Sequence, residues 1–157
     1  MHYLIVIIGA VVLLAVDLIA KAVFVGGGGT VIPGLVSIEP IRNYGAAFGI
    51  FQDGRIFLII TTFVILAAGV VFYLRFKQGR GSKLFNVGCA FVLGGALGNL
   101  FDRLFLGYVR DFLKFDFLDF LNFPICNLAD VFLNVGVVIL VVYFIFVYRS
   151  TQSANKS

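Results

Sequence analysis

Long apolar runs separated by short polar segments dominate the chain. Four runs are long enough to cross about 30 Å of hydrocarbon, and they occupy residues 3–25, 56–74, 84–101 and 131–148. The second run contains no charged residue, and at about 1.5 Å of rise per residue its helix would be about 28 Å long. The pattern therefore predicts four transmembrane helices.

The first run differs from the others because Asp17 and Lys21 interrupt it. A cleaved signal peptide is the alternative for an apolar run near the start of a chain. No basic segment precedes this run and no small-residue cleavage site follows it. We therefore expect a retained helix.

Positive residues in the short polar segments predict the orientation of the helices. Residues 75–83 hold four basic residues and no acid, and residues 149–157 add two more. Both segments are expected in the cytoplasm, together with both termini. Segments 26–55 and 102–130 then lie outside, and the second of them carries five aspartates against three basic residues.

The two external segments have different patterns. In residues 26–55 apolar positions alternate only over short stretches after a run of glycines, which predicts two or three short strands. Residues 102–130 mix phenylalanine and leucine with acids, which predicts a loop or helix at the membrane interface. The predicted fold is an all-α integral membrane bundle of four helices, with a small extracytoplasmic β element and a Phe-rich interfacial segment.

Composition supports a membrane protein and excludes two other classes. Hydrophobic residues make up 61% of the 157 residues and charged residues 13%, against about 45–50% and about 25% in soluble domains. This length suits one domain, residues 1–157. The net charge of +4 is scattered and forms no basic stripe, so nucleic-acid binding is not expected. Two cysteines, Cys89 and Cys126, cannot build a disulfide framework.

Aspartates are the main candidates for chemistry. His2, the only histidine, is predicted on the opposite side, so histidine-based metal sites and Ser-His or Cys-His pairs are not expected. Asp17, Asp102 and Asp130 come from three helices and converge on one predicted depth. Lys21 lies one helical turn from Asp17 and is expected to pair with it. Ionisable groups inside a membrane mark a functional site by default, although a structural polar network is an alternative.

The chemistry of paired carboxylates leaves more than one function open. Two carboxylates held close together share a proton, and such a pair can act as general base and general acid on a water molecule, without metal or cofactor. The same pair could relay protons in a small transporter. A non-enzymatic membrane scaffold would explain the apolar packing but not the external aspartates.

Four motifs stand out along the chain. They are Arg42–Gly49, Gly94–Arg103, Val109–Phe112 and Phe123–Asp130. In the second, the glycines permit close helix packing. Asn127, in the fourth, is a candidate helix N-cap.

In this order and on this four-span layout, the motifs resemble those of the lipoprotein signal peptidases, or signal peptidase II. The resemblance covers the chain from Asp17 to about Gly136. It implies a bacterial inner-membrane aspartic endopeptidase that removes the signal peptide of a prolipoprotein just before the diacylglyceryl-modified cysteine. The implied partners are that substrate and membrane lipid, and the protein is expected to be a monomer. The resemblance places the catalytic pair at Asp111 and Asp130, and supporting positions at Asn43, Gly45, Asn99, Asp102, Arg103, Asn127, Asp17 and Lys21.

Three residues depart from the pattern of that family. Arg110 stands where an apolar residue is more common, Cys126 where an aromatic residue is usual, and Val131 where serine is frequent. Arg110, as a neighbour of Asp111, is a candidate to lower the pKa of that carboxyl. A second expectation is that Arg103 pairs with Asp102.

Overall fold

The computed structural model describes residues 2–46, 50–52, 54–76 and 83–148. Four long helices dominate it: α1 (His2–Phe24), α2 (Arg55–Phe76), α3 (Lys83–Phe105) and α4 (Leu128–Val142), which continues as the π-helical segment η3 (Tyr143–Tyr148). All four are long and apolar enough to cross a membrane. Most of the predicted cytoplasmic loop, the tail 149–157 and the end of the first motif lie outside the described residues.

Helices α3 and α4 extend three or more residues beyond the predicted spans. α3 continues to Phe105, so Asp102 lies within its last turns and not just after its end. α4 begins at Leu128, three residues before the predicted span, because Asn127 caps it. The apolar pattern missed both extensions because a charged residue, Asp102 or Asp130, separates the added residues from the apolar run.

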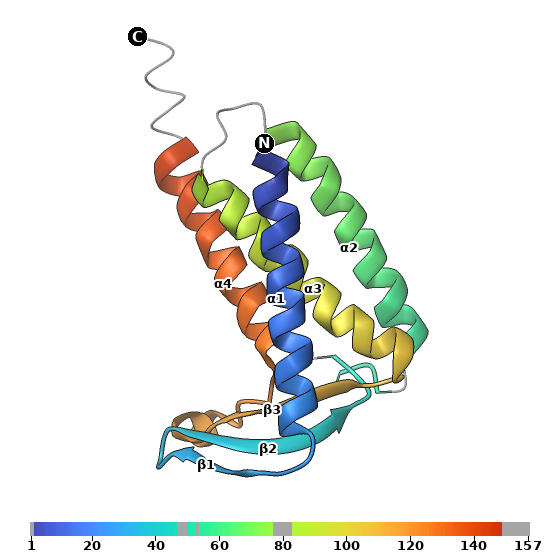
Figure 1. Ribbon diagram of the computed structural model, residues 1–157, viewed down its shortest axis with the longest axis vertical. Helices are drawn as coiled ribbons and strands as arrows, with labels where there is room; N and C mark the ends of the chain where they lie inside the picture. The colour runs from blue at the N-terminus through green and yellow to red at the C-terminus, as the bar shows by residue number, and fades with distance from the viewer. Residues whose placement is uncertain (1, 47–49, 53, 77–82, 149–157) are drawn as a thin grey trace.

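Helix α3 is the centre of the bundle, and α1, α2 and α4 all contact it (Figure 1). Its glycines explain how closely the neighbours approach. A Cβ built on Gly95 would collide with the Ala129 carbonyl oxygen of α4, and one on Gly98 would lie 2.5 Å from the Asp17 carboxylate of α1. The predicted close packing at this glycine motif is therefore confirmed. In contrast, α2 has no buried residue.

A small antiparallel sheet lies at one end of the bundle, which we call the sheet end (Figure 1). Its strand order is β1 (Gly29–Ile32), β2 (Val36–Asn43) and β3 (Val109–Phe115). The predicted β element is thus present, but its third strand comes from the Phe-rich segment and not from residues 26–55.

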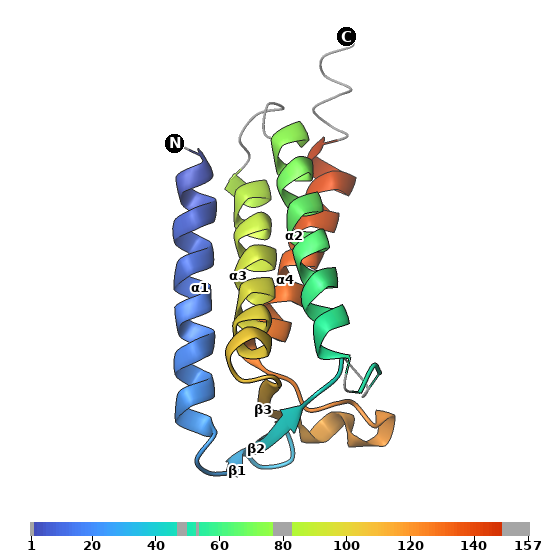
Figure 2. The ribbon, with the colours of Figure 1, turned by 90° about the vertical axis from the view of Figure 1, so that its right-hand side faces the viewer.

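The Phe-rich segment therefore differs from the predicted loop or helix. Its first part is β3, and only Asp116–Leu121 form a short 3-10 helix, η2. Pairing with β2 and the burial of Val109, Asp111 and Phe112 account for the strand. Phe112 on β3 is buried, with its ring centroid 5.1 Å from that of Phe24 at the end of α1. Figure 2 shows η2 beside the sheet, at the same end of the bundle.

Candidate active site

A buried ion pair on α1 forms the inner part of the site. Lys21 Nζ lies 2.8 Å from Asp17 Oδ2, and both side chains are fully buried. The ammonium also lies 3.4 Å from Asp102 on α3 and donates to Asn99 Oδ1 at 3.2 Å. The predicted pairing of Asp17 with Lys21 is confirmed, and it joins α1 to α3.

Asp17 also reaches the start of α4. Its Oδ1 accepts a hydrogen bond from the Ala129 backbone N–H at 2.9 Å. The first N–H groups of a helix have no partner within the helix, so this bond satisfies one of them in a buried place. One carboxylate therefore fixes the position of α4 relative to α1.

Asp102 binds Arg110 and not Arg103, so the predicted Arg103 pairing is wrong. The Arg110 guanidinium donates from Nη2 to Oδ1 at 2.7 Å and from Nε to Oδ2 at 3.2 Å, and its backbone N–H donates to Oδ2 at 3.0 Å. Arg103 Nη2 donates instead to the Gly45 carbonyl oxygen at 3.2 Å. Adjacent residues on a helix point in different directions, so Arg103 reaches the loop after β2 while Asp102 faces β3.

Asn127 and Asp130 form a capping box at the start of α4. Asp130 N–H donates to Asn127 Oδ1 at 3.0 Å, and Asn127 N–H donates to Asp130 Oδ2 at 3.1 Å. The predicted N-cap at Asn127 is confirmed. Because both side chains are used in the cap, the carboxylate of Asp130 has a fixed position at the helix terminus.

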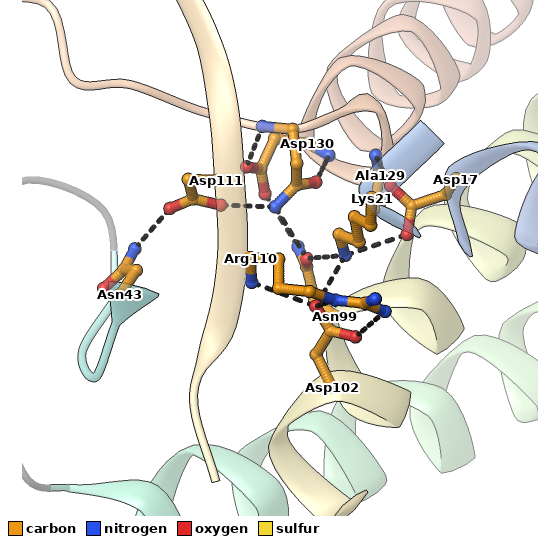
Figure 3. A network of polar contacts seen from close by, with 10 residues as sticks. Asp17, Lys21, Asn43, Asn99, Asp102, Arg110, Asp111, Ala129 and Asp130 are labelled. Atoms are coloured by element: carbon orange, nitrogen blue, oxygen red, sulfur yellow. Dashed lines mark hydrogen bonds and ion pairs between the residues drawn. The ribbon is translucent and has the colours of Figure 1, made fainter. Parts of the chain in front are cut away.

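The amide of Asn127 connects this cap to β3, and Figure 3 shows Asp111 of that strand between Asn43 and Asp130. Its Nδ2 donates to Asp111 Oδ1 at 2.6 Å and to Asn99 Oδ1 at 3.0 Å. Asn99 Nδ2 in turn donates to Asp130 Oδ1 at 2.7 Å. Two amides therefore hold Asp111 and Asp130, which come from different elements, in one hydrogen-bonded cluster.

Asp111 is 2% exposed and accepts a second hydrogen bond from Asn43 Nδ2 at 2.8 Å. Burial, followed by the negative charge of nearby Asp130, raises the pKa of Asp111 to about 6, while the two amide donors oppose the shift. The predicted lowering by Arg110 is wrong. The Arg110 side chain leaves the opposite face of the strand and is neutralised by Asp102.

The arrangement supports proton transfer. A carboxyl with a pKa of about 6 beside a second carboxyl exchanges a proton near neutral pH, as general acid–base catalysis requires. Among the described residues, no three His, Cys, Asp or Glu side chains gather as metal ligands would.

Comparison with known proteins identifies the family. The model of the family described as Signal peptidase (SPase) II matches residues 9–146. The chain belongs to this family. Curated relatives named "Lipoprotein signal peptidase" include one from Enterococcus faecalis, 40% identical over 80% of this chain and 74% of the relative. Another, from Bacillus pumilus, is 40% identical over 88% of this chain and 87% of the relative.

Solved structures agree with the family assignment. One solved structure is titled "Bacterial membrane enzyme structure by the in meso method at 2.3 A resolution". It matches with a TM-score of 0.81 and 31% sequence identity, and the match covers 97% of this chain and 91% of the chain in that structure. A second, with a similar title, has a TM-score of 0.78 and 32% identity. The chain is therefore a signal peptidase II family peptidase with the helices of a multi-pass membrane protein.

All ten residues singled out from the sequence are connected by the contacts above. Gly45 completes the set, because its N–H donates to Asn43 Oδ1 at 2.9 Å and its carbonyl accepts from Arg103. Their connection is a structural fact, whereas their roles in catalysis remain a prediction.

The three departures from the family pattern have different structural contexts. Arg110 forms an ion pair with Asp102, which gives its side chain a structural partner. Cys126 has its Sγ 3.7 Å from the Leu113 carbonyl oxygen, and burial raises the pKa of its thiol to about 12, which excludes a thiolate nucleophile near neutral pH. Nothing in the structure explains Val131.

Sequence reasoning missed Arg55, the first residue of α2. Its Nε donates to the Arg103 carbonyl at 2.8 Å, and its Nη2 donates to the Leu104 carbonyl at 3.0 Å. A cation commonly binds the last carbonyls of a helix. Arg55 therefore fixes the end of α3 beside Arg103. The sequence signal for Arg55 was its position directly before the uncharged run 56–74.

Proposed function

We propose that the chain is an aspartic endopeptidase that cleaves prolipoprotein signal peptides just before the diacylglyceryl-modified cysteine. The observation that carries the proposal is the cluster of Asp111, Asp130, Asn99 and Asn127, in a member of the signal peptidase II family. Two carboxyls in a shared hydrogen-bond network match a dyad that holds one proton.

In the proposed reaction, one carboxylate of the dyad removes a proton from a water molecule whose oxygen attacks the scissile carbonyl carbon. The other, protonated carboxyl donates its proton to the carbonyl oxygen. The tetrahedral intermediate then collapses as the C–N bond breaks: the carboxyl that took the proton from water passes it to the leaving amine, and a hydroxyl of the intermediate returns a proton to the other carboxylate. We assign the acid and base roles to the pair and not to either residue by itself.

The surrounding groups would hold this dyad in place. Asn43, Asn99 and Asn127 donate hydrogen bonds to it, which fixes the carboxyl planes. The buried Asp17, Lys21 and Asp102, with the half-buried Arg110, lie behind it and bring together α1, α3, α4 and β3. We assign these residues to support and not to bond cleavage.

We further propose that the chain is a single, monomeric domain in the cytoplasmic membrane, with cytoplasmic termini and an outward-facing sheet end. An apolar cavity of about 370 Å³ lies between the helices and is lined by Ile7 of α1, Val70 of α2 and Val92 of α3 among others. It offers apolar contacts to the signal helix or lipid chains of the substrate. The lipid-facing surface of α2 suits the same membrane.

The deciding experiment uses the purified full-length protein in detergent. A diacylglyceryl-modified prolipoprotein and its unlipidated form are incubated with the wild type, Asp111→Asn and Asp130→Asn. We expect the wild type to cleave only the lipidated form and both variants to be inactive while remaining folded, because an amide keeps the shape but cannot exchange the proton. Activity in either variant would remove that residue from the dyad. No cleavage by well-folded wild type in several lipids would favour the transporter.

A further inference from the structure

A groove of about 490 Å³ lies at the sheet end, between β2 and the chain that leads into α4. Ile41 and Asn43 of β2 line one side. Asp119 and Asn122 around η2, with Phe123 to Ile125, line the other. None of these residues belongs to the four membrane-length helices. The groove is therefore separate from the apolar cavity between the helices.

Strand register places this groove next to the proposed dyad. Ile41 pairs directly with Asp111 across the β2 and β3 ladder, and side chains of directly paired residues lie on the same face of a sheet. Asn43, two residues along β2, lies on that face, lines the groove and donates to Asp111 Oδ2 at 2.8 Å. A chain in the groove would therefore lead to Asp111.

The amide of Asn43 has one donor to offer such a chain. Its oxygen accepts from the Gly45 N–H at 2.9 Å, and its nitrogen donates to Asp111. A side-chain amide carries two N–H donors, and among the described residues only Asp111 accepts one from Asn43. The remaining N–H can donate to a backbone carbonyl.

Charge at the rim is unbalanced. Asp119 lies 3.4 Å from Lys114, which also lies 3.7 Å from Glu39. Two carboxylates therefore face one ammonium group, and Asp119 is the one that lines the groove. Its side chain is 56% exposed, so it can meet a charged group on a bound chain.

We propose that this groove binds the segment of the substrate that follows the cleaved bond, in an extended conformation, with Asp119 favouring a cationic side chain over an acidic one. This inference rests on the proposed function. The signal-peptide side of the substrate is apolar and suits the cavity between the helices. The segment after the cysteine stays outside the membrane, and a groove with both apolar and polar walls outside the helices suits it.

The test uses lipidated substrates that share one signal peptide and differ only in charge at the second to fifth residues after the cysteine. Wild-type protein should cleave the best-placed Lys substrate with kcat/KM about 3-fold or more above its Glu counterpart, mainly through KM, as an exposed charge pair allows. High salt should shrink the ratio. Asp119→Asn should reduce the ratio markedly. The matched control Asp116→Asn removes an equal charge from a side chain that binds Ser37 outside the groove lining, and should change the ratio less.

The outcomes separate this proposal from the proposed function. Equal kcat/KM for the Lys and Glu substrates at every position, or a ratio that Asp119→Asn and Asp116→Asn change equally, would overturn the groove proposal while cleavage stands. Cleavage of none of the substrates, or cleavage that survives Asp111→Asn, would overturn the proposed function as well. A substrate truncated directly after the cysteine should show a raised KM, and an unchanged KM would also contradict the groove.

Discussion

At the scale of residues, the aspartates of the site differ in what surrounds their carboxyl groups. Asp17 and Asp102 each lie against a cation, which offsets the cost of burying a charge. Asp111 accepts hydrogen bonds from two amides, and in its pKa the negative charge of nearby Asp130 outweighs the positive charge of Lys21. The first pair therefore suits a fixed ionic support, whereas Asp111 suits proton exchange.

The raised pKa of Asp111 gives a pH dependence of stability. Burial and the charge of Asp130 raise that pKa from 3.8 to about 6. Between those values the folded protein holds a proton that the unfolded chain has released, so the contribution of this group to the unfolding free energy falls as pH rises from about 4 and levels off above about 6. The fall is on the order of 3 kcal/mol. Thermal unfolding in detergent should show Asp111→Asn gaining stability relative to wild type across this window. A difference that stays constant with pH would contradict the raised pKa.

Arg110 and Asp102 should behave as one unit. Replacing Arg110 by Met leaves Asp102 with Lys21 as its one remaining ion-pair partner among the described residues, and we expect a loss of about 2–4 kcal/mol in unfolding free energy because a buried charge loses a partner. The paired substitution Arg110→Met with Asp102→Asn should cost less than the sum of the single changes. Unfolding measurements on the four proteins of this cycle provide the test, and additive losses would show that the pair is not coupled.

At the scale of elements, the position of α4 depends on small residues of α3. The backbone of α4 begins beside Gly95 and Gly98, and the same stretch of α4 carries Asp130 and the N–H that binds Asp17. Close approach of these helices is therefore a condition for the hydrogen bonds between Asn99, Asn127 and Asp130.

Glycine substitutions test this condition. Gly95→Ala forces its Cβ against the Ala129 carbonyl, and we expect a loss of about 1–3 kcal/mol together with reduced cleavage, because α4 must move. Gly69→Ala on α2 is the matched control: its Cβ meets nothing within 4 Å, and a better helix former replaces glycine there. Because Gly69 lines the apolar cavity proposed for the substrate, the two variants are compared by unfolding, and equal losses of unfolding free energy would contradict the close-packing account.

At the scale of the whole molecule, polarity is separated along the bundle axis. The sheet lies at one end of the bundle (Figure 1), and β3 connects it to the aspartate cluster. Phe72, Phe85 and Phe144 contact one another at the ends of α2, α3 and α4 that lie away from the sheet. This separation suits a protein whose site lies near one membrane surface while its body provides an apolar support.

Thiol labelling in intact cells tests the proposed orientation. Lys114→Cys on β3 should react with a membrane-impermeant reagent, since the sheet end is proposed to face outward. Lys83→Cys, at the start of α3, should react only after the membrane is permeabilised. The unmodified protein, whose Cys89 and Cys126 are partly buried, is the background control. Labelling with the reverse pattern would show that the positive residues do not set the orientation.

Much of this protein follows from local features of the chain. Apolar runs determine the four helices, because a segment without water must satisfy its backbone hydrogen bonds internally. The spacing of Asp17 and Lys21 determines an ion pair on one helical turn, and the Asn127 motif determines a cap. The motif order also indicated the family and ten residues of the connected cluster, but not the contacts that Arg110 and Arg55 make in it.

Only the tertiary structure decided which of these groups meet across the chain. Arg103 follows Asp102 directly in the sequence, but the two side chains leave α3 in different directions. Asp102 therefore forms its ion pairs with Arg110 and Lys21. The Phe-rich segment became a strand because β2 was available to pair with it. The pKa of Asp111 likewise depends on burial and on Asp130, which is distant in sequence. Local patterns fix what each segment can form, whereas long-range pairing and burial decide which charges are neutralised and which remain able to exchange a proton.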